Sequence, residues 1–166
     1  MSTVHRVLDN FAGGARPPDA RTIDKVPVYG IWFTLEAAKK AGFAGDELIV
    51  AGALAGRESF WNPWATNMNP HTKDVSYGLW QINLILPTTK RLLFQDLGLA
   101  LGEVQLLDAE TNARAARWLY NRSASVPFYA WGPYKDIPPL WGSAARNVQV
   151  VYDIAAFFGY VPKDGE

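Results

Sequence analysis

Residues 58–83 read Glu-Ser-Phe-Trp-Asn-Pro-Trp-Ala-Thr-Asn-Met-Asn-Pro-His-Thr-Lys-Asp-Val-Ser-Tyr-Gly-Leu-Trp-Gln-Ile-Asn. Glu58 opens this stretch as a single carboxylic acid beside several aromatic residues. Two Asn-Pro pairs then mark turns, and a strip of polar and aromatic residues closes the stretch at 76–83. We interpret the rest of the chain as a scaffold that places the acid against this strip.

An apolar run precedes Glu58 and predicts a buried helix over 47–58, with Asp46 as its N-cap. At the C-terminal end of such a helix, burial and the negative end of the helix dipole both favour the protonated form of a carboxyl group. A lone Glu at a helix end is more often a solvated charge, but the aromatic residues that follow it indicate enclosed surroundings. Arg57 is expected to face elsewhere, because neighbouring helical side chains point about 100° apart.

Outside this stretch, hydrophobic spacing and turn residues predict a mainly helical chain with a small irregular lobe. The length suits one domain over 1–166, in which residues 1–28 form an irregular N-terminal arm. The segment 75–85 fits either a short strand or the start of a helix. Further helices are predicted over 31–41, over 88–97 after Pro87 and before Gly98, over 109–121 after the N-cap Asp108, and over 140–158, with an aromatic loop over 123–139.

The composition excludes several kinds of chemistry. The chain has no cysteine, which excludes disulfides, zinc thiolates and cysteine nucleophiles and suits a reducing cytoplasm. Its two histidines, His5 and His71, lack metal-ligand spacing, so neither a metal nor a cofactor is expected. Sixteen basic and sixteen acidic residues cancel without a basic run, which argues against nucleic acid as a partner. No apolar run predicts a membrane span, and the first ten residues do not resemble a signal peptide.

The polar strip supplies candidate ligand-binding residues, each with a structural alternative. Gln81 and Asn83 are two positions apart, so in an extended segment they face the same side. Gly78 fits either a turn that requires positive φ or a point where a ligand approaches the backbone. Asn67 fits either a turn or a ligand contact. A protonated carboxylic acid held above such a strip is what cleavage of a glycosidic bond requires.

Two linked motifs in this stretch resemble those of the lysozyme superfamily. The pattern Glu-Ser-x-x-Asn-Pro-x-Ala-x-Asn, followed by Tyr-Gly-Leu-x-Gln-Ile-Asn, is similar both to chicken-type lysozymes and to soluble lytic transglycosylases. The form Ser-Tyr-Gly-Leu-Trp-Gln-Ile-Asn resembles lysozyme-like domains of bacteriophage lysins. The resemblance covers about 26 residues closely. It implies an α+β lysozyme-like fold, in which a cleft lies between a helical part and a small irregular or β lobe.

The resemblance implies a role for each matching residue. Glu58 stands at the position of the catalytic acid. Residues 78–81 match the Gly-Leu-Met-Gln motif that helps build the floor of the sugar site, with Trp80 in place of Met. The third transglycosylase motif, Ala-Tyr-Asn, has no clear match; 119–121 and 129–131 are the nearest segments. The implied substrate-binding residues are Asn67, Tyr77, Gly78, Gln81 and Asn83, together with Trp131 and Tyr134 from the late aromatic segment.

The chain departs from chicken-type lysozymes at the second carboxylate. Ser76 stands at that position, and Asp74, two residues earlier, is either a substitute or a solvated loop charge. A retaining hydrolase needs carboxyl groups about 5–5.5 Å apart, and an inverting one about 6.5–9.5 Å. A lytic transglycosylase needs only the acid, because the C6 hydroxyl of its substrate attacks. The absence of an obvious partner slightly favours the transglycosylase or the inverting route, and Asp74 and Ser76 stay as candidate catalytic residues that position water.

The resemblance implies a glycosidase that cleaves the β-1,4 bond between N-acetylmuramic acid and N-acetylglucosamine in peptidoglycan. The expected partner is the glycan strand, and the expected state is a monomer or a component of a phage particle. Without a signal peptide, the protein is expected to be made in the host cytoplasm and to reach the cell wall after holin release or with the virion. The alternatives are a non-catalytic glycan-binding or structural virion module, and a hydrolase acting on chitin.

Overall fold

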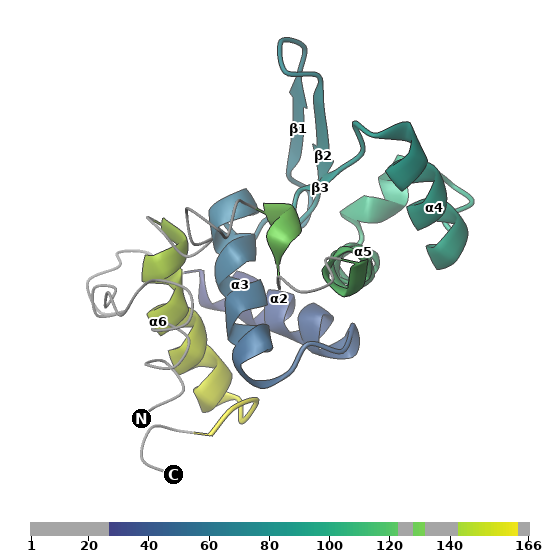
Figure 1. Cartoon of the computed structure of the whole chain (residues 1–166). Helices are drawn as coiled ribbons and strands as arrows, with labels where there is room; N and C mark the ends of the chain where they lie inside the picture. The colour runs from purple at the N-terminus through teal and green to yellow at the C-terminus, as the bar shows by residue number, and fades with distance from the viewer. Residues whose placement is uncertain (1–26, 123–127, 132–142, 163–166) are drawn as a thin grey trace.

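The computed structural model describes residues 27–122, 128–131 and 143–162 (Figure 1). Its elements are α2 (Val28–Lys40), α3 (Gly45–Ser59), β1 (Thr66–Asn69), β2 (Asp74–Tyr77), β3 (Ile82–Asn83), α4 (Pro87–Leu97), the 3-10 turn η2 (Glu103–Leu107), α5 (Ala109–Arg122), the 3-10 turn η3 (Tyr129–Trp131) and α6 (Ser143–Phe157). This arrangement confirms the predicted fold class, a mainly helical chain with a small β lobe. The predicted arm lies outside the described residues except at 27–28, and α2 begins at Val28.

Helix α3 is the central helix of the described chain, because residues 48–56 are all buried and a helix that is apolar on every side belongs in the interior. It packs against α2 and α6 (Figure 1). At Gly52 the helices come so close that a Cβ atom would lie 2.7 Å from Cγ1 of Val151. The helix begins at Gly45 with Ala44 as its N-cap, so the predicted N-cap Asp46 lies in the first turn instead. There its negative charge still favours the helix N-terminus.

The chain leaves α3 abruptly after Ser59. Phe60 caps the helix in the left-handed region at φ 51°, and Trp61 follows at φ 57°. Two successive non-glycine residues with positive φ cost about 1–2 kcal/mol each. The buried indole of Trp61 holds this turn, since its Nε1 donates to the backbone oxygen of Gly52 at 2.9 Å. The sharp turn leaves Glu58 on the last turn of the helix.

The ambiguous segment 75–85 contributes two of the three strands in an antiparallel sheet of order β1-β2-β3. Asn67 lies opposite Ser76, and Ser76 lies opposite Asn83. Residues that are directly opposite across a sheet share a face, so these three form one polar row. The tight turn between β2 and β3 places Gly78 at φ 77° and Gln81 at φ 46°.

Helix α4 lies on the other side of the sheet from α3 in Figure 1, and α5 packs against both α4 and α2. Pro87 opens α4, and Gly98 ends it in the left-handed region. Asp108 caps α5, because its Oδ2 accepts the backbone N–H of Thr111 at 2.9 Å. Pro87, Gly98 and Asp108 therefore mark the helix ends at which they were predicted. Within the described residues, none of the helices combines the length and the apolar character that crossing a membrane requires.

Candidate active site

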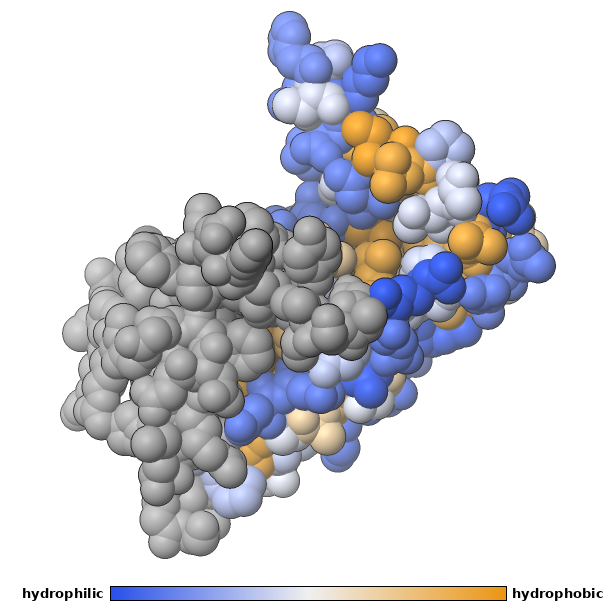
Figure 2. All heavy atoms as spheres, viewed as in Figure 1, coloured by the Kyte–Doolittle hydropathy of each residue, from blue (hydrophilic) through white to orange (hydrophobic). Residues whose placement is uncertain are grey.

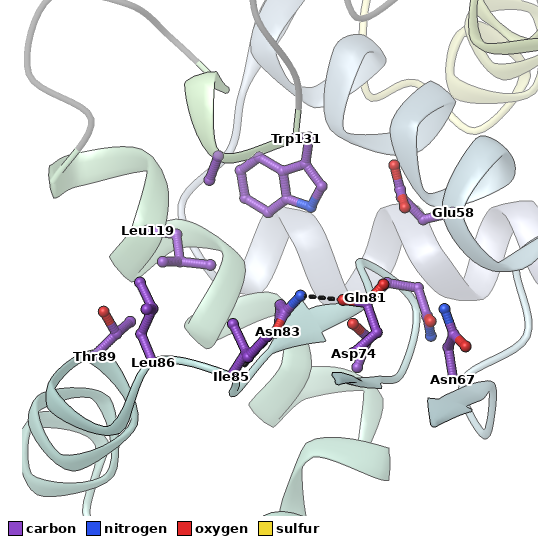
Figure 3. Close-up of a pocket in the computed structure, with 12 residues that line it drawn as sticks. Glu58, Asn67, Asp74, Gln81, Asn83, Ile85, Leu86, Thr89, Leu119 and Trp131 are labelled. Atoms are coloured by element: carbon purple, nitrogen blue, oxygen red, sulfur yellow. Dashed lines mark hydrogen bonds between the residues drawn. The ribbon is translucent and has the colours of Figure 1, made fainter. Parts of the chain in front are cut away.

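A cleft of about 570 Å³ opens where the end of α3 faces the sheet and the start of α4 (Figure 3). Seven of the predicted site residues line it. The full lining consists of Glu58 from α3; Asn67, Asp74, Ser76, Gln81 and Asn83 from the sheet and its turn; Ile85, Leu86 and Thr89 around the start of α4; Leu119 from α5; and Ala130 and Trp131 from η3.

Glu58 faces the polar strip across this cleft. Figure 3 shows its carboxyl group on one side, and Asn67, Gln81 and Asn83 on the other. The side chain is 24% exposed, so it is in contact with solvent but does not project into it. Glu58 therefore lies at the cleft, opposite the polar strip, as the sequence analysis expected of its position.

Arg57 lies against Glu58, and the expectation that it faces elsewhere was wrong. Its guanidinium group forms an ion pair with Oε1 of Glu58, to which Nε donates at 2.9 Å. Its Nη2 also donates to the backbone oxygen of Trp131 at 2.6 Å. The angular argument concerns the direction of Cβ, whereas an arginine side chain is long and flexible enough to curl back toward its neighbour.

The polar row on the sheet forms the floor of the cleft. Asp74 is two residues before Ser76 and therefore points to the same face. Asn83 donates from Nδ2 to Oδ1 of Asp74 at 2.6 Å and accepts the backbone N–H of Ile85 at 2.9 Å. Asp74 is thus a half-buried and hydrogen-bonded residue that lines the cleft.

Gln81 is held by its own turn and by the residue that precedes β1. It donates from Nε2 to the backbone oxygens of Ala65 at 3.1 Å and Gly78 at 3.0 Å. Because an amide nitrogen has two hydrogens, the group that Gln81 can offer to a ligand is the acceptor Oε1. Gln81 therefore both fixes the turn and lines the cleft.

Tyr77 and Gly78, predicted to bind substrate, do not line the cleft. Tyr77 follows Ser76 along β2, so its side chain points to the opposite face, where it packs against the core. At Gly78 a Cβ atom would lie 2.3 Å from Nδ2 of Asn112 and 2.5 Å from the backbone oxygen of Leu106. The close approach at this glycine is therefore made by α5 and η2. Tyr134 lies outside the described residues.

Asn112 on α5 is a supporting residue that the sequence analysis missed. It is fully buried, accepts the backbone N–H of Trp80 at 2.9 Å, and donates to the backbone oxygens of Tyr77 and Leu106 at 2.8 and 2.9 Å. One side chain thus fixes the turn that precedes Gln81. The available signal was an asparagine within the alanine-rich face of a predicted helix, where a polar group needs a partner.

The far part of the cleft is apolar. Ile85 and Leu86 are 42% and 62% exposed although they are large hydrophobic residues, and Leu119 faces the same space (Figure 3). Figure 2 shows hydrophobic surface beside the hydrophilic hairpin. Trp131 lies between the two parts and is fixed by a 2.8 Å hydrogen bond from its Nε1 to the backbone oxygen of Trp80. The cleft therefore suits a ligand with both hydroxyl or amide groups and apolar faces.

Comparison with known families agrees with this geometry. The model of a family described as "Lysozyme like domain" matches residues 35–129, more than half of the chain. The match includes every residue that lines the cleft except Ala130 and Trp131. No curated protein and no solved structure matches the chain.

Proposed function

The chain belongs to the family of lysozyme-like domains, and we propose that it is a glycosidase that cleaves the glycan strands of peptidoglycan. In this proposal Glu58 donates a proton to the oxygen of the β-1,4 bond between N-acetylmuramic acid and N-acetylglucosamine. The observation that carries the proposal is the position of the Glu58 carboxyl group opposite a polar row in a cleft of about 570 Å³. An acid placed beside a leaving oxygen contributes roughly 10²–10⁴-fold to such a reaction.

The other residues of the cleft match the chemistry of an N-acetylated sugar strand. Asn67, Asn83 and Oε1 of Gln81 offer hydrogen bonds to hydroxyl and acetamido groups. Ile85 and Leu86 offer contacts to acetyl methyl groups and to the apolar faces of the sugar rings. Sugar rings have polar edges and apolar faces, so a cleft that is divided in this way suits them.

Two routes fit this set of residues. In a hydrolase, Asp74 or Ser76 would position the attacking water, and the hydrogen bond from Asn83 holds Asp74 at the cleft for that task. In a lytic transglycosylase, the C6 hydroxyl of the muramyl residue attacks and leaves a 1,6-anhydro sugar. The mass of the products separates the two, because hydrolysis leaves reducing ends.

The proposal is tested by digestion of purified peptidoglycan, followed by mass spectrometry of the fragments. The parent protein should release fragments, and Glu58→Gln should lower the rate by at least about 10²-fold, since an amide keeps the shape but is no acid. The matched control is Glu110→Gln, which changes an exposed carboxylate on α5 that is paired with Lys40 of α2 and should leave the rate unchanged. Chitin oligomers offered in parallel identify a chitin-specific hydrolase.

A non-catalytic module is the second candidate. Such a module would bind glycan strands equally well before and after Glu58→Gln and would release no fragments.

For the biological role we propose lysis of a bacterial host by a phage, either as a free lysin that passes the membrane with a holin or as a component of the particle. The form of the motif at 76–83 supports this role, and mass spectrometry of purified virions would tell the two situations apart.

A further inference from the structure

The guanidinium group of Arg57 joins two parts of the cleft wall that are 74 residues apart in the chain. On one side it forms an ion pair with Glu58. On the other it donates from Nη2 to the backbone oxygen of Trp131 at 2.6 Å, and Trp131 donates to the backbone oxygen of Trp80. A continuous set of contacts therefore runs from the acid through Arg57 to the turn that carries Gln81.

We propose that Arg57 is the positioning residue of Glu58: it fixes the direction of the carboxyl group toward the polar strip. The inference rests on the proposed function, in which Glu58 must carry a proton before it donates one. The charge-assisted contact from Arg57 holds the carboxyl group in one orientation, and it stabilises the carboxylate that remains after proton transfer.

Arg57 is the charged side chain to substitute, because it contacts Glu58 directly. Among the cleft-lining residues that the structure describes, the other ionisable side chain is Asp74 on β2, and it is hydrogen-bonded to Asn83 at 2.6 Å. Arg57 belongs to α3, as Glu58 does, and its side chain is 25% exposed. Solvent therefore screens the ion pair only in part, and the loss of Arg57 changes the charge that Glu58 experiences.

Two substitutions separate the charge of Arg57 from its geometry. Arg57→Met removes the charge and the contacts with Glu58 and Trp131. We expect kcat to fall several-fold, because the carboxyl group is no longer held in place. Arg57→Lys keeps the charge but replaces the planar fork by a single ammonium group. We expect it to recover part of the lost kcat, with KM little changed in both variants.

The matched control is Lys40→Met, which also removes one cation. Lys40 pairs with Glu110 on the surface, where the two side chains are 59% and 57% exposed, so its loss should leave kcat unchanged. A second readout needs no activity: a crystal structure of each variant. We expect the carboxyl group of Glu58 to turn away from the polar strip in Arg57→Met and to keep the parent's direction in Lys40→Met.

The outcomes distinguish the inference from the proposed function. A parent protein that releases no fragments overturns the proposed function, and the crystal structure of Arg57→Met still decides whether Arg57 directs the carboxyl group. A parent that cleaves peptidoglycan, together with an Arg57→Met variant that keeps the parent's kcat and the parent's direction of Glu58, overturns the inference alone. Thermal unfolding of each variant identifies a loss of rate that comes from unfolding.

Discussion

The hydroxyl group of Ser59 lies 2.9 Å from the backbone oxygen of Leu79, to which it donates, and so ties the last turn of α3 to the turn between β2 and β3. It also lies 3.0 Å from the backbone oxygen of Ala55. A hydroxyl group has one hydrogen, so the two acceptors share it. Because Glu58 precedes Ser59 and Gln81 follows Leu79 by two residues, this contact fixes the acid relative to the polar strip.

Ser59→Ala should therefore lower activity more than stability. Loss of one hydrogen bond costs about 1 kcal/mol of unfolding free energy, whereas a small displacement of the acid lowers the rate of peptidoglycan cleavage by about tenfold or more. The control is Thr34→Val, which removes a buried hydroxyl group that bonds within α2, to the backbone oxygen of Gly30 at 2.7 Å. Urea unfolding should give similar losses for both variants. An equal loss of rate in the two would contradict the role assigned to Ser59.

Gly78 and Gly98 both have positive φ, at 77° and 67°, but differ in their surroundings. A Cβ atom at Gly78 meets Asn112 and the backbone of Leu106, whereas at Gly98 nothing lies within 4 Å. Gly98→Ala should cost about 1 kcal/mol from backbone strain alone. Gly78→Ala should cost about 1–3 kcal/mol more, because it overpacks the contact with α5. Equal losses in urea unfolding would show that Asn112 moves aside without cost.

The stability of the protein should fall at high pH through Tyr120. Burial raises the pKa of Tyr120 to about 12, and its hydrogen bond to Glu47 acts in the same direction. In the unfolded chain the pKa lies near 10.0, so the folded state holds the phenolic proton more tightly. The stabilisation is therefore fully present below about pH 10 and is lost as the pH rises toward about 12.

Tyr120→Phe removes this titration. The unfolding free energy of the variant should fall less steeply than that of the parent between about pH 10 and 12, as measured by urea unfolding at a series of pH values. Tyr29→Phe is the control, since Tyr29 is 72% exposed, and it should keep the parent's slope. Parallel curves for the parent and Tyr120→Phe would contradict the assignment.

The sequence predicted those features that depend on neighbouring residues. Pro87 and Gly98 mark the ends of α4, and Asp108 caps α5, because each acts through its own backbone or through residues within one turn. Glu58 was placed at the end of a buried helix for the same reason. These local signals, with the two linked motifs, were sufficient for the fold class and for most of the residues that line the cleft.

Features that depend on contacts between distant segments were not predictable. The direction of Arg57 is set partly by the backbone oxygen of Trp131, and Asn112 finds its partners on the β2–β3 turn and in η2. Tyr77 was assigned to the cleft because it lies in the motif, although strand alternation sends it to the core side. Strands as short as β3 carry too little alternation to be told from the start of a helix.

Leu86 should contribute to substrate binding rather than to stability. It is 62% exposed in the free protein but lines the apolar part of the cleft. Leu86→Ala should leave the unfolding free energy within about 0.5 kcal/mol of the parent. It should raise KM for glycan fragments by about three- to tenfold, because a bound sugar no longer buries the leucine side chain. The control is Leu101→Ala, which changes a 78% exposed leucine outside the cleft lining and should leave KM unchanged. Equal KM values for the two variants would show that substrate does not occupy the apolar part of the cleft.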